Sequence, residues 1–329
     1  MSVRRAGLGL IVLCLMAVLP AGGAEAMSCT ASIGSPVIFS GIDILAGGPV
    51  DVSSTLDVTC TVSTLDGAVG ALLNITVCPN IGEGSGGSVS GTRQLQRSGG
   101  GTLNYNIYQD AARSIQWGHA SFPALGTVPP ITMSVTVPLL STASTSASRP
   151  IYFRLFGSQQ TAAPGTYTSS FAGAHTLIRA GIGLGGCPGV YLITSSPQAP
   201  FSVEATFIKN CTVTTQNVNF GSVGVLNSNI DTTGQVNVTC TQSTDYSAGL
   251  SVGSFTPTTR RMVKGGEFIT YGLYRDVART QGWGDTAGTM PTATGTGLTQ
   301  NYTVYGRVAP QATPTAGTYN DTVVVTITY

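Results

Sequence analysis

Short segments in which apolar or β-branched residues alternate with polar ones recur along the whole chain. Residues 55–62, 131–137, 234–241 and 302–308 are clear examples. A period of two puts the apolar side chains on one face of a strand, and the Gly, Pro, Asn and Ser residues between the segments favour turns. Only single turns at 110–113 and 276–279 are helix candidates. About seven short strands in each half of the chain predict an all-β fold made of Ig-like, pilin-type sandwich modules.

One block of sequence occurs twice, because residues 105–118 recur as residues 271–284. The repeated positions are Tyr105, Tyr108, Asp110, Arg113 and Trp117 in the first copy, and Tyr271, Tyr274, Asp276, Arg279 and Trp283 in the second. Such a repeat predicts tandem modules, which we place at residues 27–196 and 197–329. We expect the block to be scaffold, with each aspartate and arginine bridging one turn and each tryptophan filling the core.

The first 26 residues have the pattern of a secretory signal peptide. Arg4 and Arg5 precede an apolar run at 6–19, and small residues end at Ala26. The apolar run is shorter than the roughly 18 residues that a membrane-spanning helix needs. The sequence therefore predicts export of a mature chain that begins at Met27.

Of the 7 cysteines, Cys14 lies in the signal peptide. The others are Cys29, Cys60, Cys78, Cys187, Cys211 and Cys240. An even number in an exported chain predicts disulfide bonds. Similar spacing favours one bond within each module, from Cys29 to Cys60 and from Cys211 to Cys240, which leaves Cys78 and Cys187 for each other. Metal binding is the alternative, but the sequence has no C-x-x-C pair or Cys/His cluster, so we expect neither a metal nor a cofactor.

Charged residues make up only 9% of the chain, against a usual ~25%. Without the signal peptide, acidic and basic side chains are equal in number. This balance argues against nucleic acid or an anionic membrane as a partner. The abundant Gly, Ser, Thr and Val suit an extracellular β-protein better than a cytoplasmic enzyme.

The second module carries several spaced motifs of one known family, at residues 205–213, 219–221, 238–241, 271–285, 305–307 and 316–329. Together they resemble the spore coat protein U domain, the module of Csu-type archaic chaperone-usher pili. The first module resembles it more loosely, because Phe39-Ser40 stands where Phe220-Gly221 is found and no Tyr-Gly-Arg occurs. The resemblance implies an incomplete sandwich, completed first by a periplasmic chaperone and then by the next pilin subunit, with assembly at an outer-membrane usher.

The end of module two agrees with an incomplete sandwich. The alternating apolar residues Val323, Val325, Ile327 and Tyr329 finish the chain, so we expect them to form an acceptor edge for a donor strand. The alternative is that the sheet closes on itself. Only Met27 and Ser28 precede Cys29 in the mature chain, and a donor strand needs about ten residues. We therefore expect a subunit that accepts a strand without donating one, which places it at a fibre tip.

Module one is the expected binding module, because its intervals 60–105 and 118–165 are longer than their counterparts and insertions fall in loops. Three loop segments offer apolar residues: Leu65, Val69, Leu72, Phe122, Leu125, Val128, Ile131, Ile182, Leu184, Val190 and Tyr191. If they gather at one pole, they form an apolar patch suited to a host or abiotic surface. The alternative is that they pack into the core or between the modules.

Other motifs have simpler interpretations. Residues 181–186 match G-x-G-x-x-G, but no helix follows. His119 and His175 have no partner motif such as G-x-S-x-G, so we expect no enzyme. The leading hypothesis is a tip adhesin of an archaic chaperone-usher pilus, exported through the periplasm to the cell surface, which mediates attachment and biofilm formation. The alternatives are a structural pilin or coat subunit and a secreted lectin-like binding module.

Overall fold

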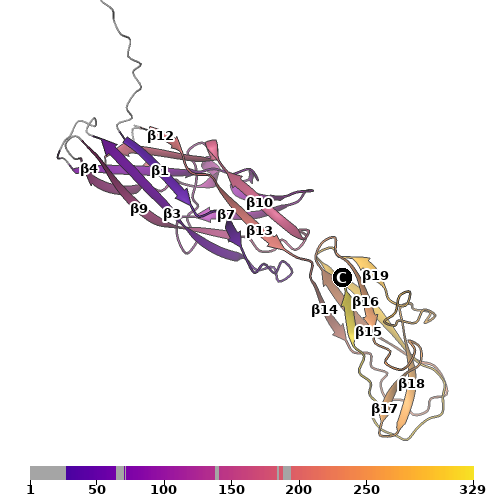
Figure 1. Cartoon of the computed structure of the whole chain (residues 1–329). Helices are drawn as coiled ribbons and strands as arrows, with labels where there is room; N and C mark the ends of the chain where they lie inside the picture. Colours follow the sequence, from indigo (N-terminus) through magenta and orange to yellow (C-terminus); the bar gives the residue numbers. More distant parts are fainter. Residues whose placement is uncertain (1–26, 64–69, 71, 138–140, 184, 188–193) are drawn as a thin grey trace, which may run out of the picture.

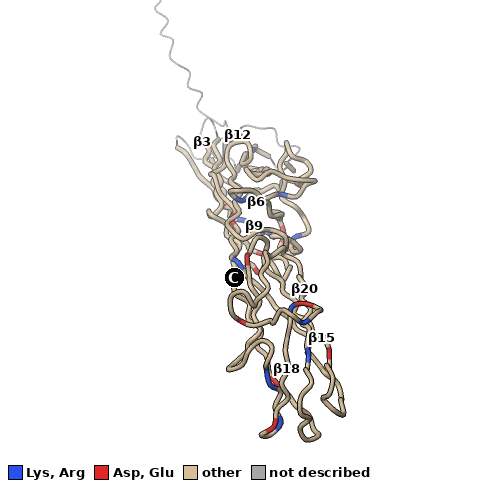
Figure 2. Tube along the Cα trace, turned by 90° about the vertical axis from the view of Figure 1, so that its right-hand side faces the viewer, with Lys and Arg blue, Asp and Glu red and all other residues tan. Residues whose placement is uncertain are grey.

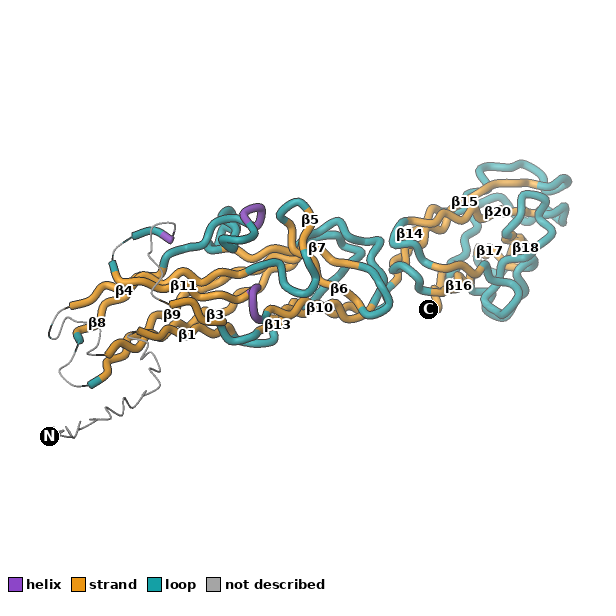
Figure 3. The backbone as a smooth tube through the Cα atoms, turned by 90° about the horizontal axis from the view of Figure 1, so that it is seen from above, coloured by secondary structure: helices purple, strands orange, loops and turns teal. Residues whose placement is uncertain are grey.

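The computed structural model describes residues 27–63, 70, 72–137, 141–183, 185–187 and 194–329. Two β-rich modules lie end to end along one long axis (Figures 1 and 3). Each module has its own apolar core. Helical structure in the described residues is limited to short 3-10 turns of module one, such as η2 (Pro123–Leu125) and η3 (Gly173–His175). No helix in the described part of the chain is long and apolar enough to cross a membrane. The all-β prediction is confirmed.

The larger sheet of module one has the order β1-β3-β9-β7-β6-β10-β13-β2, with β5 beside β6. Its strands are β1 (Met27–Ile33), β2 (Val37–Phe39), β3 (Val50–Ser63), β5 (Ser88–Val89), β6 (Thr92–Arg97), β7 (Thr102–Tyr108), β9 (Thr142–Leu155), β10 (Gly165–Phe171) and β13 (Phe201–Phe207). The alternation of apolar and polar residues becomes alternate burial. In β1, for example, Met27, Cys29, Ala31 and Ile33 are buried and the residues between them are exposed.

The smaller sheet of module one has the order β12-β11-β4-β8. Its strands are β4 (Leu72–Ile81), β8 (Ile131–Thr136), β11 (Thr176–Ile182) and β12 (Thr194–Pro197). Residues of both sheets form one buried cluster that includes Trp117, Phe153 and Tyr167. The two sheets therefore make the sandwich that the alternating pattern predicts.

Module two is a smaller version of the same sandwich. Its sheets have the orders β14-β15-β20-β18-β17 and β19-β16-β21. The strands are β14 (Cys211–Gln216), β15 (Ile230–Cys240), β16 (Asp245–Leu250), β17 (Arg260–Lys264), β18 (Glu267–Tyr274), β19 (Thr292–Thr294), β20 (Thr299–Val308) and β21 (Val325–Thr328). Its core is built around Trp283, Tyr246 and Leu250.

The two ends of the rod are referred to below by fixed names. The free pole of module one is the end where Leu72 pairs with Thr136 and Ile182 pairs with Ile75. The distal pole of module two is the end that carries the β17–β18 hairpin, remote from module one (Figures 1 and 3). The C-terminal residue lies at the opposite end of module two, beside the junction with module one.

Strand β13 corrects the predicted module boundary. The sequence placed residues 197–329 in module two, yet β13 pairs with β10 and with β2, and Phe201, Val203, Ala205 and Phe207 belong to the module-one core. The boundary therefore lies at the linker 208–210. The sequence did not predict this boundary, because the motif before Cys211 belongs to the repeat unit of module two. In the structure, however, the strand that contains this motif, β13, completes the sheet of module one.

Charged residues are sparse and scattered along the backbone of both modules (Figure 2). Among the residues that the structure describes, Lys and Arg form no stripe of the kind that follows a nucleic-acid backbone. The fold thus presents a hydroxyl-rich surface, on which the notable sites are apolar or lie at strand edges.

Candidate functional site

The site that the fold leaves open is the side of module two between β14 and β21. Strand β14 pairs with β15 alone and β21 pairs with β16 alone, so within the described residues each has one edge without a neighbour. An edge strand presents backbone N–H and C=O groups that have no partner in a neighbouring strand. We call the space between β14 and β21 the open groove.

Burial shows that the open groove reaches the core. Val213 faces inward, because its register partner Val238 is fully buried, yet Val213 is 39% exposed. In module one the equivalent β1 residue, Ala31, pairs with the buried Val58 and is only 4% exposed. An inward-facing valine that stays exposed indicates a sandwich with uncovered apolar surface.

The same contrast holds on the other side of the groove. Strand β11 of module one corresponds to β21, and its inward residues Ile178 and Ala180 are each 1% exposed. On β21 and beside it, Val323, Val325 and Ile327 are only partly buried against the core, and Tyr329 is 54% exposed. The four residues predicted as an acceptor edge are therefore incompletely covered, next to the edge of β21 that has no neighbour among the described residues.

Module one shows what covers this space when it is filled. Strand β12 pairs antiparallel with β11, from Leu177 opposite Pro197 to Ala180 opposite Thr194. The chain then passes along β1, where Ala199 N–H donates to the carbonyl of Ala31 at 3.0 Å, and continues into β13. The segment that leads into module two thus completes module one, and no described segment does the same for module two.

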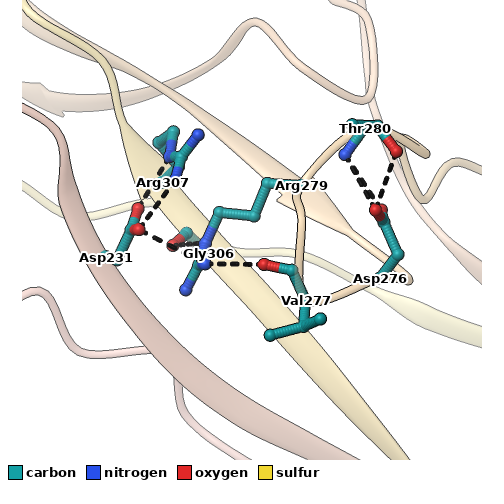
Figure 4. A network of polar contacts seen from close by, with 7 residues as sticks. All are labelled: Asp231, Asp276, Val277, Arg279, Thr280, Gly306 and Arg307. Atoms are coloured by element: carbon teal, nitrogen blue, oxygen red, sulfur yellow. Dashed lines mark hydrogen bonds and ion pairs between the residues drawn. The ribbon is translucent and has the colours of Figure 1, made fainter.

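The repeated block forms a turn in each module, in which the aspartate and the arginine have separate functions; Figure 4 shows the turn of module two. The Asp276 carboxylate accepts hydrogen bonds from the backbone N–H groups of Thr280 and Gln281. Arg279 has a φ of 57° and points away from Asp276, toward Asp231, with an Nη1–Oδ2 distance of 3.2 Å. The predicted bridge across one turn is therefore wrong. Asp276 holds the turn, and Arg279 fixes it to the first residues of β15.

Asp231 is the centre of this network. Arg307 on β20 forms two parallel hydrogen bonds to it, at 2.7 and 2.8 Å. These bonds, followed by the charge of Arg279, hold the pKa of Asp231 below its usual range despite the opposing effect of burial. Arg279 also donates from Nε to the carbonyl of Gly306 and lies over the ring of Tyr305. The network ties β15, β20 and the turn together.

Module one repeats this network with one substitution. Asp51 binds Arg154 and Arg113, as Asp231 binds Arg307 and Arg279. Tyr152-Phe153-Arg154 therefore occupies the position of the Tyr-Gly-Arg motif of module two, an equivalence that the sequence analysis did not predict. The sequence does contain a sign of this equivalence, because Asp51 and Asp231 lie equally far before Cys60 and Cys240.

A buried arginine in each module was missed by sequence reasoning. The Arg93 guanidinium donates to the carbonyls of Gly82, Ile81 and Trp117, and Arg260 donates to Ser251, Leu250 and Trp283 in the same arrangement. Burial lowers the pKa of Arg93 to about 10, so it stays charged at neutral pH. These arginines hold the loop after the tryptophan against the smaller sheet.

The other scaffold predictions agree with the structure. Trp117 and Trp283 are buried and donate from Nε1 to the carbonyls of Pro79 and Ala248, both at 2.8 Å. The remaining repeat residues lie in the same two cores or at their borders: Tyr105, Tyr108, Tyr271 and Tyr274. The disulfide pairs are as predicted: Cys29–Cys60, Cys78–Cys187 and Cys211–Cys240.

The predicted adhesive residues divide into groups. Leu65, Val69, Leu184, Val190 and Tyr191 lie outside the described residues. Leu72 and Ile182 both lie at the free pole of module one and are 64% and 42% exposed. The segment 122–131 does not join them, because Ile131 is at the opposite end of β8 from the free pole. Within it Leu125 and Ile131 are buried, while Phe122 and Val128 are half-buried.

Phe122 is held by the two histidines instead of facing solvent. Its ring is 5.1 Å from that of His119 and 5.7 Å from that of His175, centroid to centroid. His119 is buried, accepts a hydrogen bond at Nδ1 from the N–H of Ser121, and has a pKa lowered by burial. Among the described residues, no group of three or more His, Cys, Asp or Glu side chains could hold a metal ion.

Comparison with known proteins also divides the chain into two segments, the second of which begins before β13. The model of the family described as Spore Coat Protein U domain matches residues 16–173 and 198–326. Protein U of Myxococcus xanthus is 46% identical over 63 residues, which are 19% of this chain and 35% of that relative, so the match spans about a third of the relative's length.

Two solved structures that match this chain come from pilus systems. The chaperone-tip adhesion subunit pre-assembly complex CsuC-CsuE of Acinetobacter baumannii Csu pili matches with a TM-score of 0.50 and 17% identity, over 92% of this chain and 100% of that chain. The CupB6 tip adhesin of Pseudomonas aeruginosa has a TM-score of 0.34 and 14% identity, over 92% and 95%. The first match shows a shared fold. Because the family model matches most of the chain in two successive segments, this protein belongs to the spore coat protein U domain family.

Proposed function

We propose that this protein is a subunit of an archaic chaperone-usher pilus, reaches the cell surface through the periplasm, and accepts a donor strand in the open groove of module two. The observation that carries the proposal is the contrast between Val213, 39% exposed, and Ala31, 4% exposed. A strand added between β14 and β21 would pair with both free edges and cover the apolar residues beneath them, which is how β-strand addition gives affinity.

The chaperone, the usher and the adjacent pilin are the partners that this proposal requires. A chaperone would fill the open groove before assembly, and the N-terminal extension of the adjacent pilin would replace it in the fibre. The solved complex with a similar fold contains a chaperone bound to a tip adhesion subunit. Module one provides internal support, because the segment that leads into module two, β12 and β13, already completes it in this way.

The experiment compares the full chain made with and without the periplasmic chaperone of its pilus system. Without a chaperone, the chain should aggregate or exchange strands, and a synthetic peptide with the N-terminal extension of the adjacent pilin should restore a stable monomer. A peptide whose alternate apolar residues are aspartates is the control. Val213→Asp should prevent rescue, whereas Val277→Asp, on a turn where Val277 is 70% exposed, should not. A stable monomer with no added strand would contradict the proposal.

We further propose that module one is the adhesive module and that the subunit is placed at the fibre tip. Leu72 and Ile182 form exposed apolar surface at the free pole, the end most remote from the open groove. Apolar surface at the free end of a rod is suited to contact with a nonpolar host or abiotic surface. A fibre with this subunit at its tip would therefore present the free pole first and support biofilm formation.

Adhesion to polystyrene by cells with assembled fibres tests this second proposal. The double variant Leu72→Ser and Ile182→Ser should reduce adhesion, while Ile208→Ser, at the linker where Ile208 is 78% exposed, should leave it unchanged. Unchanged adhesion of the double variant, with normal fibre numbers, would favour a structural pilin or coat subunit instead. Immunogold labelling of this protein along the fibre shaft and not at the fibre ends would also favour a structural pilin or coat subunit.

A further inference from the structure

The β17–β18 hairpin at the distal pole has an unusual outer face. Register pairs Val263 with Phe268 and Arg261 with Thr270, so these four side chains lie together on one face, while Arg260 and Tyr271 face the core. Val263 is 54% exposed and Phe268 is 44% exposed. A two-stranded ribbon with an apolar outward face is a candidate interaction surface.

Arg261 is stacked between two exposed rings on this face. Its guanidinium carbon is 4.1 Å from the centroid of Phe268 and 4.8 Å from that of Phe255, which is 40% exposed in the loop before β17. No ion pair or hydrogen bond of Arg261 to another described residue is found. The rings hold the guanidinium plane in position and leave its N–H groups free for an acceptor from outside the chain.

Module one lacks this surface, although it has the same hairpin. Arg93 and Arg260 make matching hydrogen bonds, so β6–β7 corresponds to β17–β18 position by position. The outward positions in module one are Gln94, Gln96, Thr102 and Asn104. Gln94 and Asn104 bond to each other at 3.1 Å. The scaffold therefore does not require an apolar face here, and its presence in module two needs a separate cause.

The internal junction shows where a donor's body would lie. In module one the completing segment runs antiparallel to β11, and the body that follows it, module two, continues the rod. Module one itself occupies the opposite end of module two. A donor that enters the open groove in the same direction, antiparallel to β21, would therefore leave it at the distal pole. Its folded body would come to rest beside the β17–β18 hairpin.

We propose that Phe255, Arg261, Val263 and Phe268 form a docking surface for the folded body of the subunit that donates its strand to module two. This inference rests on the proposed strand acceptance. The matching surface is an apolar patch that presents a carboxylate or a backbone carbonyl to Arg261. Arg and aromatic residues with an unpaired polar group at their centre are typical of the few residues that dominate an interface. The contact would fix the angle between this protein and the fibre.

Site-specific photo-cross-linking in native fibres tests the docking surface. The full chain, made with its own chaperone and usher, carries benzoyl-phenylalanine at Phe268, at Tyr329 in the open groove, or at Leu298. Leu298 is exposed and follows Gly297, which lies against Gln160 of module one. Mass spectrometry identifies each captured chain. The proposal expects Phe268 and Tyr329 to capture the same pilin subunit and Leu298 not to capture it.

The possible results separate the two proposals. Capture of a pilin at Tyr329 but not at Phe268 would overturn the docking surface and leave strand acceptance standing. No pilin at Tyr329 would overturn both, and capture of chaperone or usher alone at Phe268 would overturn the docking surface. As a second measurement, Arg261→Ala should lower the amount of this protein retained on washed fibres about tenfold, the effect of losing a dominant interface residue. Thr270→Ala on the same face should leave retention unchanged.

Discussion

Replacement of Arg93 by methionine should strongly destabilise module one. Arg93 is buried and donates to the carbonyls of Gly82 and Ile81 at 2.6 Å and of Trp117 at 2.7 Å. Each buried acceptor left without its donor costs about 1–3 kcal/mol. Some of these carbonyls keep other contacts, so the expected loss is about 3–5 kcal/mol, a large part of the ~5–15 kcal/mol that stabilises a domain.

The two tryptophans make this loss measurable in the full chain, because each module contains one. In a Trp283→Phe background, the fluorescence of Trp117 reports the unfolding of module one in urea. A loss of about 3–5 kcal/mol corresponds to a fall in the midpoint of about 1.5 M or more. Arg149→Met is the matched control, since Arg149 makes a single bond to the carbonyl of Pro130 near the surface, and should change the stability by less than about 0.5 kcal/mol.

Two results would refute the reasoning. A loss below about 1 kcal/mol for Arg93→Met would mean that water or other groups satisfy the three carbonyls. If Arg93→Met kept full stability and Arg149→Met lost stability, the exposed hydrogen bond of Arg149, and not the buried hydrogen bonds of Arg93, would be the one that stabilises module one. Arg93→Lys should be intermediate, because one ammonium group cannot reach all three carbonyls with the geometry of a guanidinium fork.

Three further predictions concern other parts of the scaffold. Asp231→Asn should destabilise module two by only about 1 kcal/mol, because the ion pairs of Asp231 are partly exposed. Urea unfolding measures this loss. As a control, Asp57→Asn changes an exposed carboxylate of module one and should have no effect on the stability of module two. The pKa of His119 is lowered in the fold, so His119 should not reduce the stability of module one above pH ~6.5, and the stability should fall as the pH drops below that value toward the folded pKa. His119→Gln should weaken this dependence of unfolding free energy on pH, measured by urea titrations at several pH values. The same dependence in the variant would contradict the prediction. Replacing Cys211 and Cys240 with serine opens a loop with a sequence separation of 29 and should cost about 3–4 kcal/mol in calorimetry of the peptide-bound chain.

The architecture was predictable because the alternating segments and the duplicated block carry their information locally. Strands, module count, disulfide pairs and the two core tryptophans follow from such patterns. The buried arginines were not predictable in this way, because arginine is almost never fully buried and neither Arg93 nor Arg260 stands out from its neighbours in the sequence. Their burial depends on backbone carbonyls that only the folded loops bring together.

The open groove was predicted from the apolar end of the chain, but its other side was not. Only the structure shows that Val213 on β14 is left without a cover. The error over Asp276 and Arg279 has a related cause. Their short spacing suggested a local pair, whereas Arg279 has a positive φ and its partner, Asp231, lies in a distant strand.

Strand β13 also determines how the rod responds to pulling. It lies in the sheet of module one, paired with β10 along its whole length and with β2, and it continues directly through the linker into module two. A force that separates the modules therefore acts along the strand axis, so the hydrogen bonds of β13 are loaded together in shear and do not open one after another. Cys211, the first residue after the linker, is bonded to Cys240, so the same force enters β15 through a covalent bond. The linker between the modules therefore transmits tension from one module to the other without breaking the hydrogen bonds of β13 one at a time.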